Sequence, residues 1–114
     1  MTREQKWAKA AYDAVMVAKQ GDEKAAKEFG SLCKNGPGIL QRAGAAQALG
    51  FWNRNAKDKT YLDALARVWG STRGGDLLAL TLKAELKPYM VLTRELMSAA
   101  IWLRRFAQAE IADE

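Results

Sequence analysis

Histidine is absent from this sequence of 114 residues, and cysteine occurs once, at Cys33. Histidine is the usual general base near neutral pH and the commonest metal ligand, so its absence argues against most acid–base catalysis and against an ordinary zinc site. A single cysteine cannot form an internal disulfide, which is typical of proteins from a reducing compartment. We expect Cys33 to be a small, buried core residue rather than a reactive one.

Long apolar runs are missing as well. No stretch approaches the ~20 apolar residues that a membrane-spanning helix needs. The N-terminal segment MTREQKWAKAAYDAV carries charges throughout and lacks the uninterrupted apolar centre of a secretory signal. We therefore expect a cytoplasmic protein without membrane contact. Apolar and polar residues nowhere alternate over a length that predicts a β-strand.

Carboxylates arranged for catalysis are also lacking. Asp58, Asp63, Asp76 and Glu85 are the candidates for a catalytic pair, but they do not have the spacing of metal ligands on one helical face. Serine and cysteine side chains have no histidine to activate them as nucleophiles. We predict a protein that is not an enzyme and that holds neither a cofactor nor a metal ion.

The sequence is rich in apolar residues at helical spacing. The longest such stretch covers residues 89–109, where one stripe recurs at intervals of three and four residues. Its members are Tyr89, Leu92, Leu96, Ala99, Leu103 and Phe106. A first helix is expected after Thr2, which can form a capping box with Gln5. We predict a single all-α domain over residues 1–114, a compact bundle of five to seven helices with a long, largely buried C-terminal helix.

Glycine and proline indicate helix boundaries along the chain. Residues 35–36, Asn-Gly, are expected to end a helix, with Pro37 in the first turn of the next one. That next helix would contain Gly44 and Gly50, and helices usually keep such glycines where another backbone comes close. Pro88 predicts a boundary before the final helix.

Polar segments are expected to separate the later helices. Residues 53–59, NRNAKDK, form a predicted basic loop, and Asp58 or Thr60 is the expected cap of the helix that follows. Residues 71–75 are predicted to be a flexible break, after which Asp76 caps a short apolar helix. The acidic tail EIADE is expected to fray.

The net charge of +5 is concentrated in one segment. Residues 34–73 hold seven Lys or Arg against two acidic residues, whereas residues 1–33 hold six against five and residues 74–114 five against six. A local basic excess favours a polyanionic partner. The candidate nucleic-acid-binding residues are the basic side chains of this segment after Lys34, namely Arg42, Arg54, Lys57, Lys59, Arg67 and Arg73.

Two further features each have a structural and a functional interpretation. Trp52 can stack on a base, although filling a gap between helices is the simpler role. Arg104 and Arg105 are adjacent, so their side chains point roughly 100° apart on a helix. We expect at least one of them to form an ion pair inside the molecule, with Glu95 or Asp63.

Three stretches carry a family pattern. They are EQKWAKAAYDAV near the N-terminus, PGILQRAGAAQALGF from Pro37, and TRELMSAAIWLRRFA from Thr93, preceded by Tyr89. Together they resemble the small subunit of the type III-B CRISPR effector, the Cmr RNA-guided interference complex. The third stretch is the most specific because its charged residues match at fixed places as well as its apolar ones. The matching residues of the second and third stretches are Pro37, Leu40, Gly44, Gln47, Leu49 and Phe51, then Tyr89, Thr93, Arg94, Glu95, Leu96, Ala100, Trp102, Leu103, Arg104, Arg105, Phe106 and Ala107.

The resemblance implies an all-α, non-catalytic protein of antiviral defence. In that family several copies stack alongside other Cmr subunits and form part of the channel that holds guide RNA paired with target RNA. The partners implied are other Cmr subunits, further copies of the chain, and guide and target RNA gripped through sequence-independent backbone contacts.

Two other functions remain open. One is a free-standing DNA-binding regulator with residues 58–73 as its recognition helix, but the apolar side chains there leave little polar surface for base edges. The other is an accessory protein without nucleic-acid contact, whose charge only steers it towards an acidic partner. Sequence-specific binding favours the regulator, whereas RNA binding that weakens steeply with salt favours the backbone-contacting subunit.

Overall fold

The computed structural model describes residues 1–70 and 72–112, and this part of the chain contains six α-helices and no strand. The helices are α1 (Arg3–Lys19), α2 (Glu23–Ala43), α3 (Ala45–Trp52), α4 (Ala56–Gly70), α5 (Gly74–Lys83) and α6 (Leu86–Glu110). The predictions of an all-α fold and of five to seven helices are confirmed.

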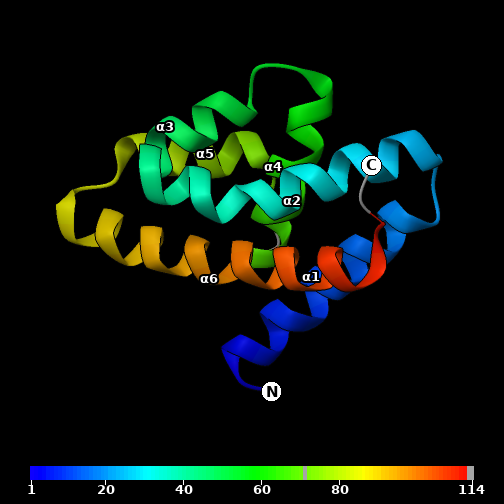
Figure 1. The fold of residues 1–114 in the computed structure, drawn as a ribbon. Coiled ribbons are helices and arrows are strands. Elements are labelled where there is room, and N and C mark those ends of the chain that lie inside the picture. Colours follow the sequence, from blue (N-terminus) through cyan, green and yellow to red (C-terminus); the bar gives the residue numbers. More distant parts are fainter. Residues whose placement is uncertain (71, 113–114) are drawn as a thin grey trace.

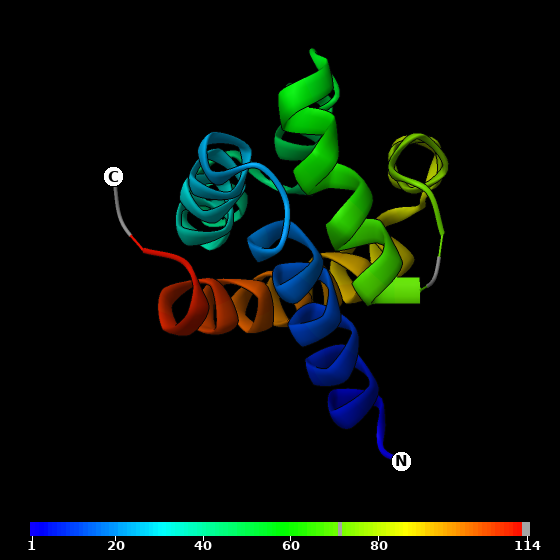
Figure 2. The same cartoon turned by 90° about the vertical axis from the view of Figure 1, so that its right-hand side faces the viewer.

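The long C-terminal helix α6 is the element on which the others are assembled. The helix α2 runs antiparallel to α6 along one side, and α1 crosses α6 at a steep angle (Figure 1). The helix α4 packs against α1, α2 and α6, while α5 packs chiefly on α3 and α4 at the edge of the molecule (Figure 2). The Cα radius of gyration of 13.1 Å is close to the ~13 Å expected of a compact domain of this length.

The predicted apolar stripe of α6 faces the core. Leu92, Leu96, Ala99 and Leu103 are buried, and Phe106 is half-buried against the edge of the Tyr12 ring. The first two turns of α6 differ, because their apolar side chains lie at the surface. The prediction of a long, largely buried C-terminal helix therefore holds from Leu92 onward.

Ion pairs join α1 to α6 near both ends of α1. Arg3 lies 2.8 Å from Glu95, and Lys19 lies 3.0 Å from Glu110. Glu95 also accepts a hydrogen bond from Nε1 of Trp69. The carboxylate of Glu95 is thus engaged by α1 and α4.

The expected ion pairs of the adjacent arginines in α6 are absent. Glu95 pairs with Arg3, and Asp63 accepts a hydrogen bond from the backbone of Gly74. The guanidinium of Arg105 instead lies 5.2 Å from the ring centroid of Trp102. Within the described residues, neither Arg104 nor Arg105 has an ion pair.

The helix α2 continues through Pro37, so the predicted boundary there was wrong. Proline lacks the N–H that would bond to the carbonyl four residues earlier, which costs helix stability. Burial of Gly36 and Pro37 compensates for this loss, because α2 packs closely on α4 at this point. A Cβ atom on Gly36 would clash with the hydroxyl group of Tyr61, so only glycine fits.

The break comes at Gly44 instead, between α2 and α3. Its φ of 84° is in the left-handed region that favours glycine. Gly44 has no side chain with which to cap α3. The hydroxyl oxygen of Tyr89 in α6 accepts a hydrogen bond from the backbone N–H of Ala46 instead. Gly50 lies inside α3 but would have no atom within 4 Å of an added Cβ, so the expected close backbone approach is not found there.

The helix α4 begins earlier than expected, at Ala56, so Lys57 and Lys59 lie on a helix and not in a loop. The cap is the side chain of Asn55, whose Oδ1 accepts a hydrogen bond from the backbone N–H of Asp58. Thr60 does not cap the helix, because its hydroxyl donates to the carbonyl of Ala56 inside it. Local propensity alone did not distinguish Asn55 from the candidate caps that follow it.

The helix α5 also begins earlier than expected, at Gly74, and Asp76 makes no capping hydrogen bond. Asp63 of α4 accepts the first-turn N–H of Gly74 at 2.9 Å and replaces a local cap. A Cβ atom on Gly74 would lie 2.6 Å from Oδ1 of Asp63. The expectations for Ser71 and for residues 113–114 lie outside the described residues. The Thr2 capping box with Gln5 is confirmed. A boundary does precede the final helix, but it lies at Ala84 and Glu85, and Pro88 is the third residue of α6.

Candidate nucleic-acid interface

The structure places the six candidate residues on four parts of the fold. Arg42 lies in the last turn of α2, and Arg54 and Lys57 lie around the junction of α3 with α4. Lys59 and Arg67 follow along α4, and Arg73 precedes α5. All six side chains are exposed. The basic excess of residues 34–73 is therefore spread over several surfaces.

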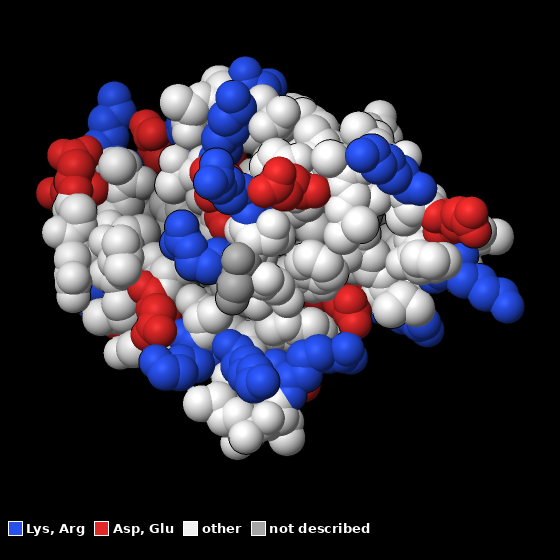
Figure 3. All heavy atoms as spheres, turned by 180° about the vertical axis from the view of Figure 1, so that it is seen from behind, with Lys and Arg blue, Asp and Glu red and all other residues white. Residues whose placement is uncertain are grey.

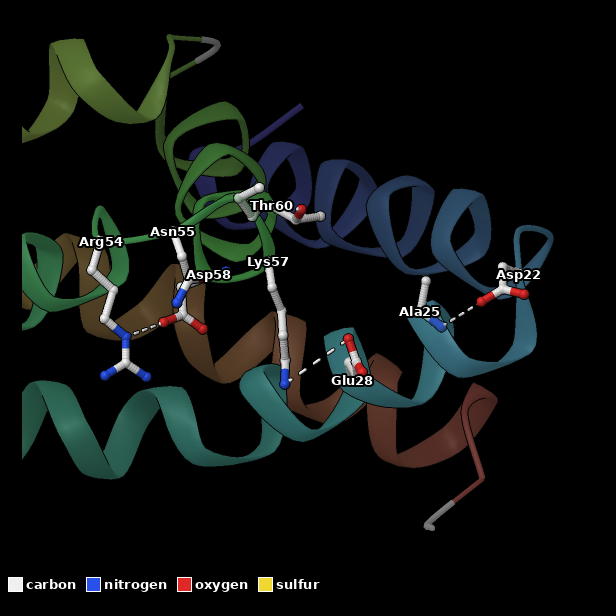
Figure 4. Close-up of polar contacts among 9 residues, drawn as sticks. Asp22, Ala25, Glu28, Arg54, Asn55, Lys57, Asp58 and Thr60 are labelled. Carbon is white, nitrogen blue, oxygen red and sulfur yellow. Dashed lines mark hydrogen bonds and ion pairs between the residues drawn. The ribbon is translucent and has the colours of Figure 1, made fainter.

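Arg54 is held by two neighbours in fixed positions. Its Nε lies 2.6 Å from Oδ2 of Asp58, whose side chain is only 4% exposed (Figure 4). The guanidinium carbon lies 3.9 Å from the ring centroid of Phe51, so the planar group stacks on that ring. The Arg54 side chain is nevertheless 55% exposed. It combines an anchored inner edge with an outer end open to solvent.

Lys57 points towards α2 rather than straight out from the molecule. Its Nζ lies 3.9 Å from Oε2 of Glu28 (Figure 4). The two residues border a hollow lined by acidic and basic groups in equal number, which are Asp22, Glu23, Lys24, Lys27, Glu28 and Lys57. Because the charges there are balanced, this hollow is a weak attractor for a polyanion.

Lys59 and Arg67 lie on the same outward face of α4. They are eight residues apart, which is ~12 Å along a helix. Within the described residues neither of them has an ion pair. Asp63 lies between them, and its Oδ1 accepts the backbone N–H of Gly74.

Arg73, the residue before α5, lies near Arg67. Arg67 and Arg73 border one hollow, together with Asp63 and Thr72. Arg73 also has no ion pair among the residues that the structure describes. We call Lys59, Arg67 and Arg73 the α4 basic face. Figure 3 views the molecule from the side on which α5 lies and shows basic groups interspersed with acidic ones across this side.

Sequence reasoning missed the aromatic partner of Arg54. Trp52 is fully buried, 4.8 Å from the Tyr61 ring, and it fills the core as the simpler interpretation predicted. Its neighbour Phe51 is exposed instead, and the three-residue spacing from Phe51 to Arg54 was a signal for this contact. Asp58, four residues after Arg54, was a second such signal.

A second surface that sequence reasoning missed is apolar. Five large side chains from α5 and the first turns of α6 are exposed, namely Leu80, Leu82, Leu86, Met90 and Val91. We call this group the α5–α6 apolar surface. It borders a groove of about 430 Å³ lined by Trp69, Leu80, Ala84, Lys87, Pro88, Val91, Leu92 and Glu95. The signal in the sequence was a ten-residue helix that is apolar on nearly all sides, which requires partners on several sides.

The buried reactive groups are confined to the core. Burial raises the pKa of the Cys33 thiol and also that of the Tyr61 hydroxyl, each well above its ordinary value. Among residues 1–70 and 72–112, no cluster of three or more His, Cys, Asp or Glu side chains is arranged to hold a metal ion. No helix in this part of the chain is long and apolar enough to cross a membrane.

Comparisons with known proteins give consistent matches over nearly the whole chain. The model of a family described as CRISPR-associated protein (Cas_Cmr5) matches residues 3–110. The chain is 37% identical to the CRISPR system Cmr subunit Cmr5 of Thermus thermophilus over 114 residues, covering 98% of both proteins. The crystal structure of a CRISPR-associated Cmr5 family protein from the same organism superposes with a TM-score of 0.92 at 36% identity, covering 98% of this chain and 99% of that one.

Proposed function

The chain belongs to the Cmr5 family of CRISPR-associated proteins, and on this premise we propose that it is the small subunit of the type III-B Cmr interference complex. The observation that carries this proposal is the family match over residues 3–110 together with the TM-score of 0.92. We propose that the subunit is non-catalytic and acts in the cytoplasm by binding and positioning other components.

We propose that the subunit contributes to the channel that holds guide RNA paired with target RNA. Its RNA contacts would come from the six candidate residues, with the α4 basic face contributing most. The three side chains of that face are exposed and have no ion pair in the described part of the chain, so binding a phosphate breaks no existing pair. Lysine and arginine contacts to phosphates carry no sequence information, which suits a subunit that must accept any guide.

Stacking of several copies is the second part of the proposal. Exposed apolar groups occur at two ends of the molecule: the α5–α6 apolar surface at one end and Val17, which is 71% exposed, near the end of α1 (Figure 1). Val17 borders a hollow that reaches from α1 to Arg67 of α4 and is lined by Ala14, Ala18, Phe29, Thr60, Asp63, Ala64 and Arg67. A contact between two different surfaces joins copies head to tail, which generates an open stack when the rotation between copies does not close a ring.

A stand-alone DNA-binding regulator is less well supported. Most of the apolar side chains of α4 are buried against the rest of the molecule. The exposed charged groups along the helix after its first turn are Lys59, Asp63 and Arg67, which are few for reading base edges. Such a face suits phosphate contacts better than a sequence-specific interface.

Copurification tests the proposal most broadly. An affinity-tagged chain expressed in its natural host is expected to bring down a guide RNA and the other Cmr subunits. Recovery of the tagged chain alone, or with one genomic DNA sequence, would contradict the proposal. An excess of the untagged chain during lysis controls for exchange after the cells are broken.

A further inference from the structure

We infer that Arg54 binds a phosphate of the RNA backbone end-on through its two terminal amino groups, and that Asp58 and Phe51 hold it in position to do so. The inference rests on the proposed function and deepens it. It assigns to Asp58 and Phe51 a role in RNA binding without direct contact with RNA.

Asp58 fixes one edge of the guanidinium. The Asp58 side chain is only 4% exposed, so its neighbours hold it in one position. The backbone N–H of Asp58 is also held, because it donates a hydrogen bond to the side chain of Asn55. The Nε–H of Arg54 is donated to Asp58 at 2.6 Å. The ion pair therefore determines the direction in which the rest of the guanidinium points.

Phe51 fixes one face of the same group. The distance of 3.9 Å between the guanidinium carbon and the ring centroid places the two planes in stacking contact. Such a contact attracts the cation and removes its freedom to rotate. Nε and one face of the guanidinium are therefore both occupied.

The outer end of the guanidinium stays available for a ligand. The two terminal nitrogens point away from Asp58 (Figure 4), and no acceptor contacts them among the described residues. Paired N–H groups in one plane match two oxygens of a phosphate, which a lysine ammonium cannot reproduce. A phosphodiester is thus the ligand class that fits.

Preorganisation separates this inference from simple charge attraction. Substituting Asp58 by asparagine removes a negative charge, so charge attraction alone predicts tighter RNA binding. Our inference predicts weaker binding, because Arg54 must then be ordered on binding, and ordering one long side chain costs about a 2- to 10-fold loss of affinity. Asp13→Asn is the matched control, because Asp13 forms an i,i+4 ion pair with Lys9 on α1 and does not touch Arg54.

The test is a double-mutant cycle on the full-length chain with a fluorescein-labelled RNA duplex of about 20 base pairs. Binding is measured by fluorescence anisotropy up to millimolar protein, with thermal unfolding as a check on the fold. Arg54→Gln and Asp58→Asn are each expected to weaken binding, and the Arg54→Gln/Asp58→Asn variant to bind no more weakly than Arg54→Gln. Asp13→Asn is expected to bind at least as tightly as the wild type. Phe51→Leu is expected to weaken binding about 2-fold or more.

The outcomes distinguish the inference from the proposed function. If Arg54→Gln weakens binding but Asp58→Asn does not, Arg54 contacts RNA without being positioned by Asp58, and the inference is overturned while the proposed function stands. If Asp58→Asn weakens binding equally in the Arg54→Gln background, Asp58 acts through the fold and the inference is again overturned. If wild-type binding is absent, or is unaffected by Arg54→Gln and by reversal of the α4 basic face, the RNA-binding proposal fails with it.

Discussion

The hydroxyl oxygen of Tyr89 accepts a hydrogen bond of 3.1 Å from the backbone N–H of Ala46, 43 residues earlier in the chain. Tyr89 lies in the first turn of α6, and Ala46 lies in the first turn of α3. Because Gly44 has no side chain with which to cap α3, a tyrosine from another helix supplies the acceptor. This contact fixes the start of α3 against α6.

Tyr89→Phe is expected to lower the free energy of unfolding by about 1 kcal/mol, as loss of a hydrogen bond at a helix cap does. Amide hydrogen exchange at Ala46 should become faster. Tyr12→Phe is the control, because the Tyr12 hydroxyl has no hydrogen bond among the described residues while its ring contacts Phe106. Equal losses in the two variants would contradict the capping role.

Two glycines in helices are expected to respond in opposite ways to alanine. Gly36→Ala places a methyl group against the Tyr61 hydroxyl, and overpacking of this kind costs about 1–3 kcal/mol. Gly50→Ala meets no neighbour and should stabilise α3 by up to about 1 kcal/mol. Urea unfolding followed by tryptophan fluorescence measures both changes.

The double variant Gly36→Ala/Tyr61→Phe is expected to recover part of the loss, because the closest clashing atom is gone. A Gly36→Ala variant as stable as the wild type would show that α2 and α4 are not in contact as described. A destabilised Gly50→Ala variant would show that the space beside Gly50 of α3 is not open.

Alkaline pH is expected to destabilise the protein through Cys33. Burial raises the pKa of its thiol, so the unfolded chain loses this proton first, at a pKa of about 8.5. The contribution of the protonated Cys33 thiol to the free energy of unfolding is complete below that pH. It is lost as the pH rises towards the pKa of the thiol in the folded protein. The free energy of unfolding should fall by up to about 1.4 kcal/mol per pH unit above pH ~8.5.

Cys33→Ala serves as the control for this pH dependence. Its free energy of unfolding should be lower at neutral pH because of the cavity, but it should change less between pH 8 and 10. Parallel pH profiles for the two proteins would mean that Cys33 does not contribute.

Self-association is expected to depend on two different surfaces. Leu82→Glu/Leu86→Glu, at side chains of which Leu86 is 74% exposed, should abolish stacking measured by sedimentation velocity. Val17→Glu should do the same from the other end. In a mixture of the two variants, the intact Val17 end of one variant can contact the intact α5–α6 apolar surface of the other. The mixture should therefore form dimers that do not grow further.

Ser31→Glu adds a negative charge at an exposed site in the middle of α2, between the two ends of the molecule, and should leave stacking unchanged. Failure of the mixture to form dimers would contradict a contact between unlike surfaces, and an unchanged Leu82→Glu/Leu86→Glu variant would show that the α5–α6 apolar surface is not part of the contact.

The parts of the fold that could be predicted from the sequence are those decided by neighbouring residues. Thr2 and Gln5 are three residues apart, so their capping box depends on local geometry alone. The apolar spacing in α6 likewise determines its buried stripe. Pro37 was misinterpreted because the packing that compensates for its missing N–H comes from α4, which is remote in sequence.

The candidate site shows the same division. The basic excess of residues 34–73 is visible in the composition, but the acid that faces Lys57 is Glu28 on another helix. Which cations stay unpaired is therefore a tertiary property. Asp58 and Phe51 were within reach of sequence reasoning, since they lie four and three residues from Arg54.

The role of the α4 basic face in holding RNA is tested most directly by the affinity of the assembled, guide-loaded complex for target RNA between 50 and 200 mM salt. We expect Lys59→Glu/Arg67→Glu to weaken binding. The slope of the logarithm of the binding constant against the logarithm of the salt concentration should become less steep by about 0.7–0.9 per lost phosphate contact. Lys6→Glu/Lys24→Glu makes the same change of charge at exposed residues elsewhere and should alter the affinity little. Equal effects of the two pairs, or none from either, would contradict a role for this face in holding RNA.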